Sequence, residues 1–232
     1  MAETGRGHVT GSSGAEETEN LWQVSDRLFF EDTMTDWLRE IAAEQGYEET
    51  LAAMDYARHQ HEGQFRKASR YSEEQVPYIN HPLMMACHAY ALGLADDRIL
   101  SVCLLHDVCE DCEVAPDDLP FSEGVRHAVA LLTRHPGQFP TPEEEQAHYY
   151  EGIQTDRTAS IVKVLDRCSN VSTMALAFTD ERLQSYIDET EDYILPLLDF
   201  IRETYPEYRR QTFLLRYHIL SVINSLKGMI MR

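Results

Sequence analysis

Four side chains that can bind a metal ion or move a proton fall within six residues, directly after the apolar pair Leu104-Leu105: His106, Asp107, Glu110 and Asp111. If this segment is helical, residues four positions apart lie on one stripe, and two neighbouring stripes can converge on one cavity. Imidazole and carboxylate groups gathered in this way can bind a divalent ion and activate a water molecule. The alternative, a solvated acidic helix end, is costly because carboxylates at a helix C-terminus oppose its dipole.

A second polar stripe is formed by Lys163, Asp166, Asn170 and Thr173, at offsets of three, seven and ten residues along one predicted helix. The other residues of the segment 161–168 are mostly apolar. A polar stripe on a largely buried helix lines a site or pairs internally, because an unpaired buried polar group is costly. The stripe could equally be the solvent-facing side of an amphipathic helix, and the pattern alone leaves both interpretations open.

Two further candidates are weaker when taken alone. His81 stands at a predicted helix start, where Asn80-His81-Pro82 places proline at the first helical position, and a lone histidine beside a proline is more often structural than a ligand. Arg66 and Lys67 are adjacent cations in a chain with 40 acidic residues. They are natural partners for a phosphate group, although an ordinary basic turn has the same composition.

The chain has five cysteines, and Cys109-x-x-Cys112 overlaps the acidic motif. Such a pair can belong to a zinc knuckle or a redox site, but no second pair accompanies it. We therefore interpret it as packing rather than as a dedicated metal site. An odd number of cysteines, most of them in apolar helical patterns, indicates reduced thiols and a cytoplasmic protein.

Composition excludes several classes of function. The formal net charge is −20, which opposes non-specific binding to nucleic acid or to an anionic membrane. No apolar run is long enough to span a membrane. The polar N-terminus lacks the apolar stretch of a signal peptide, so we expect residues 1–30 to form a disordered or loosely ordered tail. The remainder, residues 31–232, suits one domain.

Helical spacing dominates the chain, and alternating strand-like patterns are almost absent, which predicts an all-α fold. The capping-box sequence Thr141-Pro142-Glu143-Glu144 marks one helix start. Two polar loops, 68–76 and 134–140, are candidate rims of a cleft. The predicted helices cover Thr35–Gln45, Glu49–Glu62, 80–94, Asp96–Glu110, Phe121–Thr133, a segment around Tyr149, Thr158–Ser169, Glu181–Glu203 and Glu207–Met229.

Taken in order, these motifs resemble the HD-domain hydrolases of the RelA/SpoT type, which include the small alarmone hydrolases. The resemblance runs from about Leu51 to Phe200. Five motifs in the right order are far more specific than one His-Asp pair. The matching segments are His61-Glu62-Gly63-Gln64-Phe65-Arg66-Lys67, Pro77-Tyr78-Ile79-Asn80-His81-Pro82, Leu104-Leu105-His106-Asp107-x-x-Glu110-Asp111, Val162-Lys163-x-x-Asp166-Arg167-x-x-Asn170 and Glu189-Thr190.

The resemblance implies an HD-domain helical bundle that removes pyrophosphate from the 3′ position of guanosine tetra- or pentaphosphate. It implies one divalent ion, usually Mn²⁺, bound by His81, His106, Asp107 and Asp166. Glu110 and Asp111 would handle the attacking water. The substrate would be bound by Arg66 and Lys67, by Lys163 near a phosphate, and by Asn170 and Thr173 near the nucleoside.

Departures from the family pattern leave the substrate open. The family has Ser-Gly after Arg-Lys and then a short step to Pro-Tyr-Ile, whereas residues 68–76 intervene here, and the segment 134–160 follows no family pattern. Adenosine alarmones such as (p)ppApp and the 2′-phosphate of NADPH are therefore alternative substrates. A metal-bound nucleotide sensor is a further alternative, which the intact Glu110-Asp111 pair disfavours. The apolar face of the closing helix packs on its own domain or pairs with a partner, for instance in a homodimer.

Overall fold

The computed structural model describes residues 30–66, 75–94 and 96–230, and within them the predicted all-α fold is confirmed. Two-residue strands, β1 (Phe65–Arg66) and β2 (Val76–Pro77), form a short antiparallel hairpin. The helices are α3 (Glu31–Gln45), α4 (Glu48–Gln60), α5 (Asn80–Ala91), α6 (Asp97–Leu105), α7 (Val108–Asp111), α8 (Glu123–Leu132), α9 (Pro142–Gln154), α10 (Arg157–Ala177), α11 (Asp180–Glu189), α12 (Leu195–Thr204) and α13 (Arg209–Ile230). A π-helical segment, Thr190–Ile194, joins α11 to α12.

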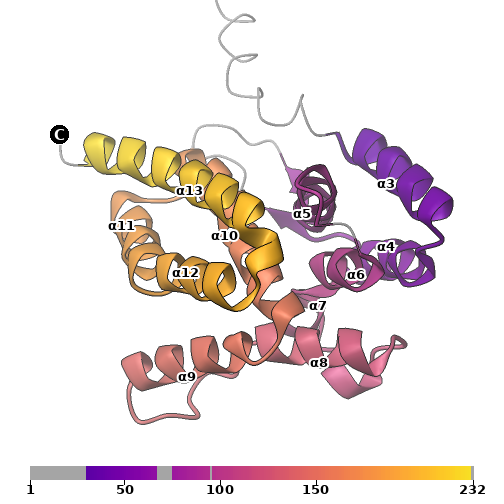
Figure 1. Cartoon of the computed structure of the whole chain (residues 1–232), viewed down its shortest axis with the longest axis horizontal. Coiled ribbons are helices and arrows are strands. Elements are labelled where there is room, and N and C mark those ends of the chain that lie inside the picture. Colours follow the sequence, from indigo (N-terminus) through magenta and orange to yellow (C-terminus); the bar gives the residue numbers. More distant parts are fainter. Residues whose placement is uncertain (1–29, 67–74, 95, 231–232) are drawn as a thin grey trace, which may run out of the picture.

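Helix α10 is the central element of the bundle. It lies between a group made of α3 to α6 and a group made of α11 to α13, and it contacts members of both (Figure 1). All residues from Thr158 to Ser169 are buried, including Lys163 and Asp166. The solvent-facing interpretation of this polar stripe therefore does not hold, and its members have to be paired inside the protein.

Capping side chains fix where several helices begin. Thr141 Oγ1 accepts a hydrogen bond from the Glu144 main-chain N–H at 3.1 Å, as the capping-box sequence predicts. Asp156 caps α10 in the same way through the N–H of Ala159, at 2.9 Å. The start of the helix that carries Asp166 is therefore fixed by a local interaction.

Two predicted helices are interrupted, and both interruptions adjoin the candidate site. The expected helix Asp96–Glu110 divides into α6 and α7, with a turn at His106 and Asp107. The His106 ring donates from Nδ1 to the Cys103 carbonyl at 2.9 Å. In a continuous α-helix this carbonyl would accept from the main-chain N–H of Asp107, so the side chain competes with the helix at this point. The prediction of one continuous helix was therefore wrong at His106, but the Asp111 main-chain N–H still donates to the Asp107 carbonyl at 2.9 Å, so Asp107 and Asp111 remain one helical turn apart. The expected helix Glu181–Glu203 is divided by the π-helical segment.

The apolar face of α13 divides between the core and the surface. Ile223 and Leu226 are buried, whereas Phe213, Leu214 and Tyr217 are exposed. No helix in the described part of the chain is long and apolar enough to cross a membrane. The tail expected over residues 1–30 lies, apart from Phe30, outside the described residues, and so does nearly all of the 68–76 loop.

Candidate active site

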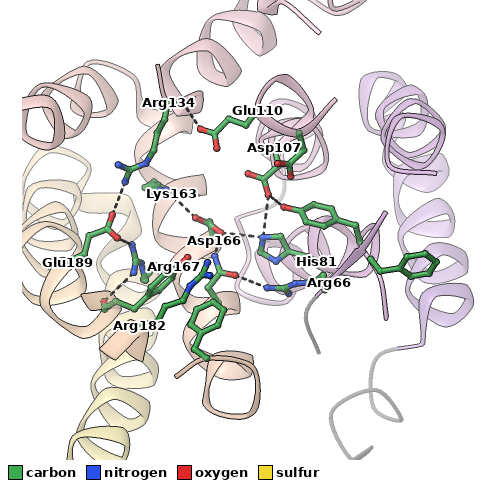
Figure 2. Close-up of a pocket in the computed structure, with 16 residues that line it drawn as sticks. Arg66, His81, Asp107, Glu110, Arg134, Lys163, Asp166, Arg167, Arg182 and Glu189 are labelled. Carbon is green, nitrogen blue, oxygen red and sulfur yellow. Dashed lines mark hydrogen bonds and ion pairs between the residues drawn. The ribbon is translucent and has the colours of Figure 1, made fainter. Parts of the chain in front are cut away.

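The four side chains implied as metal ligands meet at one point, although they come from three helical regions. His106 and Asp107 form the turn between α6 and α7. His81 lies in the first turn of α5 and Asp166 in the middle of α10, and Figure 2 shows both beside Asp107. The donor atoms of His81, His106 and Asp166 all lie within 4.8 Å of one another. We call these four residues the metal cluster.

Neither cysteine of the Cys109-x-x-Cys112 pair belongs to the candidate metal group found among the described residues.

Asp107 lies outside the group of three donors that are all within 4.8 Å of one another, but its Oδ2 atom is close to both histidines. The His106 Nε2 atom is 2.9 Å from Asp107 Oδ2, and His81 Nε2 is 3.3 Å from Asp166 Oδ1. The two cross distances are longer, 3.8 Å from His81 Nε2 to Asp107 Oδ2 and 3.9 Å from His106 Nε2 to Asp166 Oδ1. Two imidazole nitrogens and two carboxylate oxygens thus face a common point.

The donor set fits a divalent ion, because the histidines are already oriented for one. His106 uses Nδ1 for the Cys103 carbonyl, which leaves its buried Nε2 atom facing the cluster, 2.9 Å from Asp107 Oδ2 but without a well-aligned hydrogen bond in the described structure. The Nδ1 atom of His81 lies 2.9 Å from the Ser169 hydroxyl. Partners of this kind on the outer nitrogen fix the ring orientation of metal-binding histidines.

Electrostatics also favour a cation. Burial lowers the pKa of His81 to about 4, so its imidazole is neutral at pH 7. Burial acts the same way on His106, but the carboxylates of Asp107 and Asp166 outweigh it and raise its pKa to about 9. The pKa of Asp166 lies well below its usual range, since Lys163 and the histidines outweigh the effect of burial. The raised pKa of His106 shows that the two carboxylates favour a positive charge at this point, which either a proton or a metal ion can supply.

Tyr78 supports Asp107, a role that the sequence did not predict. Its hydroxyl donates to Asp107 Oδ2 at 2.5 Å, and its ring lies on that of His61 with centroids 4.6 Å apart. His61 in turn has its Nδ1 atom 2.8 Å from Gln64 Oε1. His61 and Gln64, from the motif His61–Lys67, therefore support the site indirectly: they hold Tyr78, and Tyr78 holds Asp107.

Replacing Tyr78 with phenylalanine removes this hydrogen bond and keeps the ring. We expect metal affinity to fall by about 10- to 100-fold, the usual effect of losing a partner of a metal ligand. Titration of metal-stripped protein with Mn²⁺ measures the change. Tyr208→Phe, on a half-buried tyrosine of the segment Pro206–Tyr208, is the matched control. Equal affinities for Tyr78→Phe and the wild type would contradict this role.

Glu110 and Asp111 reach the same cavity from α7, beyond the turn. Glu110 Oε1 accepts a hydrogen bond from the main-chain N–H of Arg134 at 2.5 Å. Partial burial raises the pKa of Glu110. A carboxylate with a raised pKa, placed beside a metal cluster, is suited to exchanging protons with a water molecule.

The cavity has a volume of about 520 Å³ and is lined by five cationic and five acidic side chains. The charges of the cavity wall therefore balance, in a chain whose net charge is −20. The cationic residues are Arg66, Arg134, Lys163, Arg167 and Arg182, and the acidic residues are Asp107, Glu110, Asp111, Asp166 and Glu189. Arg134, Arg167 and Arg182 were not among the residues predicted to bind substrate.

Of the predicted substrate-binding residues, Arg66 and Asn170 are joined by a hydrogen bond of 2.7 Å, and Asn170 donates to Asp166 at 2.6 Å. Lys163 Nζ lies 3.2 Å from Asp166 Oδ2. Lys67 lies outside the described residues. Thr173 is one turn further along α10 and is not among the described residues that line the cavity, because its hydroxyl bonds to carbonyls of its own helix.

We expect Arg66→Ala to weaken substrate binding and leave metal content unchanged. Arg66 lines the cavity but has no place in the metal cluster. Loss of one hydrogen bond to a charged group costs about 1.5–3 kcal/mol, so KM should rise by roughly 10- to 150-fold. Arg39→Ala, on an exposed surface ion pair, is the control. An unaltered KM would show that Arg66 does not bind the substrate.

Comparison with known proteins places this geometry in a family. No family model matches the chain. The mouse guanosine-3′,5′-bis(diphosphate) 3′-pyrophosphohydrolase MESH1 is 30% identical over 145 residues, which cover 60% of this chain and 78% of the mouse protein. The Aquifex aeolicus protein named guanosine-3′,5′-bis(diphosphate) 3′-pyrophosphohydrolase is 30% identical over 155 residues, which cover 65% of this chain and 21% of that protein.

A solved structure supports the fold. It is described as a metazoan orthologue of SpoT that hydrolyses ppGpp, and it aligns with a TM-score of 0.59 and 20% identity over 77% of this chain and 95% of the other. The all-helical fold and the sequence match to the mouse protein together define a hydrolase. The chain belongs to the family of guanosine-3′,5′-bis(diphosphate) 3′-pyrophosphohydrolases.

Proposed function

We propose that this chain hydrolyses the 3′-pyrophosphate of (p)ppGpp-type nucleotides and releases pyrophosphate. One observation carries the proposal: three members of the metal cluster (His81, Asp107 and Asp166), the Glu110-Asp111 pair and five cationic side chains all line a single cavity, and the buried His106 lies directly behind Asp107. A nucleotide with two pyrophosphate groups is strongly anionic and matches such a wall. The names of the mouse and bacterial relatives describe the same reaction.

The metal cluster supports one divalent ion, and we propose Mn²⁺. Its donors are imidazole nitrogens and carboxylate oxygens, a mixed set that suits manganese better than a metal that prefers thiolates. When bound, such an ion lowers the pKa of a bound water and polarises a phosphate oxygen. His81, His106, Asp107 and Asp166 would hold it.

The remaining steps belong to side chains of the cavity wall. Glu110 and Asp111 would take the proton from the attacking water and return one to the leaving oxygen. Arg66, together with Lys67, would hold the nucleotide phosphates. Lys163 is buried and paired with Asp166, and its pKa is raised well above the usual value in spite of burial, chiefly by the Tyr149 hydroxyl and the Asp166 carboxylate. It would therefore offer a permanent positive charge to a phosphate group.

A panel of substrates tests the proposal. ppGpp, ppApp and NADPH are each incubated with Mn²⁺-loaded protein, and the released pyrophosphate and phosphate are measured separately. The proposal predicts the highest kcat/KM for ppGpp, with pyrophosphate as the product. Phosphate release from NADPH as the fastest reaction would assign the chain to the alternative substrate class, and turnover of none of the three would favour a nucleotide sensor.

Three expectations from the sequence remain predictions. We propose that residues 31–232 act as one catalytic domain, because the metal ligands come from helices that pack directly on one another. A cytoplasmic location and a homodimer also stay predictions. Light scattering of the purified protein would measure the oligomeric state.

A further inference from the structure

Glu189 belongs to one of the motifs of the resemblance and has had no role so far, although its carboxylate lines the cavity and has four partners. It is the last residue of α11, and its side chain is partly buried. The Oε1 atom accepts from Arg134 at 2.8 Å, from Gln146 at 2.8 Å and from the Tyr150 hydroxyl at 3.0 Å. The Oε2 atom pairs with Arg167 at 2.7 Å. Four donors from three separate regions of the chain thus meet on one side chain.

The backbone around Glu189 departs from a regular α-helix. The π-helical segment Thr190–Ile194 starts at the next residue, and π-helical turns inside α-helices are frequent at functional sites. Glu191, within this segment, pairs with Lys227 of α13 at 2.6 Å. Glu189 therefore lines the cavity, whereas Glu191, two positions later, forms an ion pair with α13 away from it.

Arg134 connects Glu189 to the proposed acid-base pair. Its guanidinium is held by Glu189, by Gln146 Oε1 at 2.6 Å, and by the face of Tyr149, with its central carbon 4.2 Å from the ring centroid. Its main-chain N–H donates to Glu110 at 2.5 Å. Figure 2 shows the resulting line of contacts, from Glu110 through Arg134 to Glu189.

This line of contacts matters because Glu110 is an exposed residue on a four-residue helix. The hydrogen bond from Arg134 is the one that the described structure gives to its carboxylate. Arg134 follows Thr133, the buried C-cap residue of α8, and opens the 134–140 loop, so the contacts of its side chain add to those that hold its main chain in place. Displacing a catalytic group by about 1 Å can cost on the order of 100-fold in rate.

We infer that Glu189 is a positioning residue: it fixes the Arg134 guanidinium, and through the Arg134 main chain it holds Glu110 in the cavity. The inference rests on the proposed function only for the role of Glu110, because the contacts themselves are independent of the substrate. A purely structural role, neutralising the buried Arg167, is the competing explanation.

A double-mutant cycle separates the two explanations. Glu189→Gln should lower kcat by roughly 10- to 100-fold with near-normal KM and unchanged metal content. In a Glu110→Gln background the same change should alter the residual kcat by less than about twofold, because residues acting as one unit are non-additive. Glu191→Gln, which breaks the neighbouring ion pair to α13, should leave kcat unchanged. A full multiplicative loss in the double variant would overturn the inference.

A second measurement does not depend on turnover. The amide of Arg134 should be protected from hydrogen exchange in the wild type, through its bond to Glu110, and should lose protection in Glu189→Gln. Arg134→Ala keeps the main-chain N–H, removes only a partly exposed side chain and should show the same loss, even if Glu189→Gln folds poorly. Unchanged protection in a folded variant would overturn the inference. Changed protection in a protein that turns over no proposed substrate would uphold it while refuting the proposed function.

Discussion

Asp166→Asn should abolish metal binding and turnover together. Asp166 faces both histidines of the metal cluster, and nearby positive charges hold its pKa well below the usual range, so it is an anion at any working pH. Asparagine has nearly the same shape but replaces an anionic oxygen with a neutral amide, which removes the attraction to a divalent ion. The measurement is elemental analysis of protein stripped with a chelator and reloaded with Mn²⁺.

The same loss is expected for His106→Ala and Asp107→Ala, because each removes a donor from the common point. Asp188→Asn is the matched control, since Asp188 is an exposed carboxylate of α11 that hydrogen-bonds to Gln184. It should keep full metal content and full activity. An Asp166→Asn protein with complete metal occupancy would remove Asp166 from the ligand set.

Glu110→Gln and Asp111→Asn should behave in the opposite way, keeping the metal and losing kcat. Both side chains line the cavity, but among the described residues it is Asp107 and Asp166, not Glu110 or Asp111, whose carboxylates lie within 3.9 Å of His81 and His106. A positioned carboxylate that moves a proton in the transition state contributes on the order of 10²–10⁴-fold in rate, so each variant should lose most of kcat while its Kd for substrate stays near normal.

The two losses should not multiply, because residues that act as one unit are non-additive. Metal content, substrate Kd and kcat measured on the same variants decide the point. Wild-type kcat in Glu110→Gln would show that the acid-base assignment is wrong.

The parts of the fold that depend on local signals could be predicted from the sequence. Apolar spacing indicated the helices, and the capping box at Thr141 gave the start of α9. The turn at His106 and Asp107 could not be predicted, because it depends on a side-chain bond to the Cys103 carbonyl that competes with the regular helix. The π-helical segment after Glu189 had no local signal either, since propensity scales describe α-helices.

The same distinction applies to the site. His106, Asp107, Glu110 and Asp111 stand close together in the sequence and were recognised by their spacing. Tyr78 is 29 residues from its partner Asp107, and Arg134 is 55 residues from Glu189. Pairs so far apart become visible only when the helices that carry them are packed. Charge gave a partial signal, because clustered cations are unusual in so acidic a chain.

The most direct test of the account is an analysis of all products formed from ppGpp by the Mn²⁺-loaded protein. The account predicts GDP and pyrophosphate in equal amounts, no turnover after the metal is removed, and recovery when Mn²⁺ is restored. Release of single phosphates, or turnover that persists unchanged in metal-stripped protein, would contradict it.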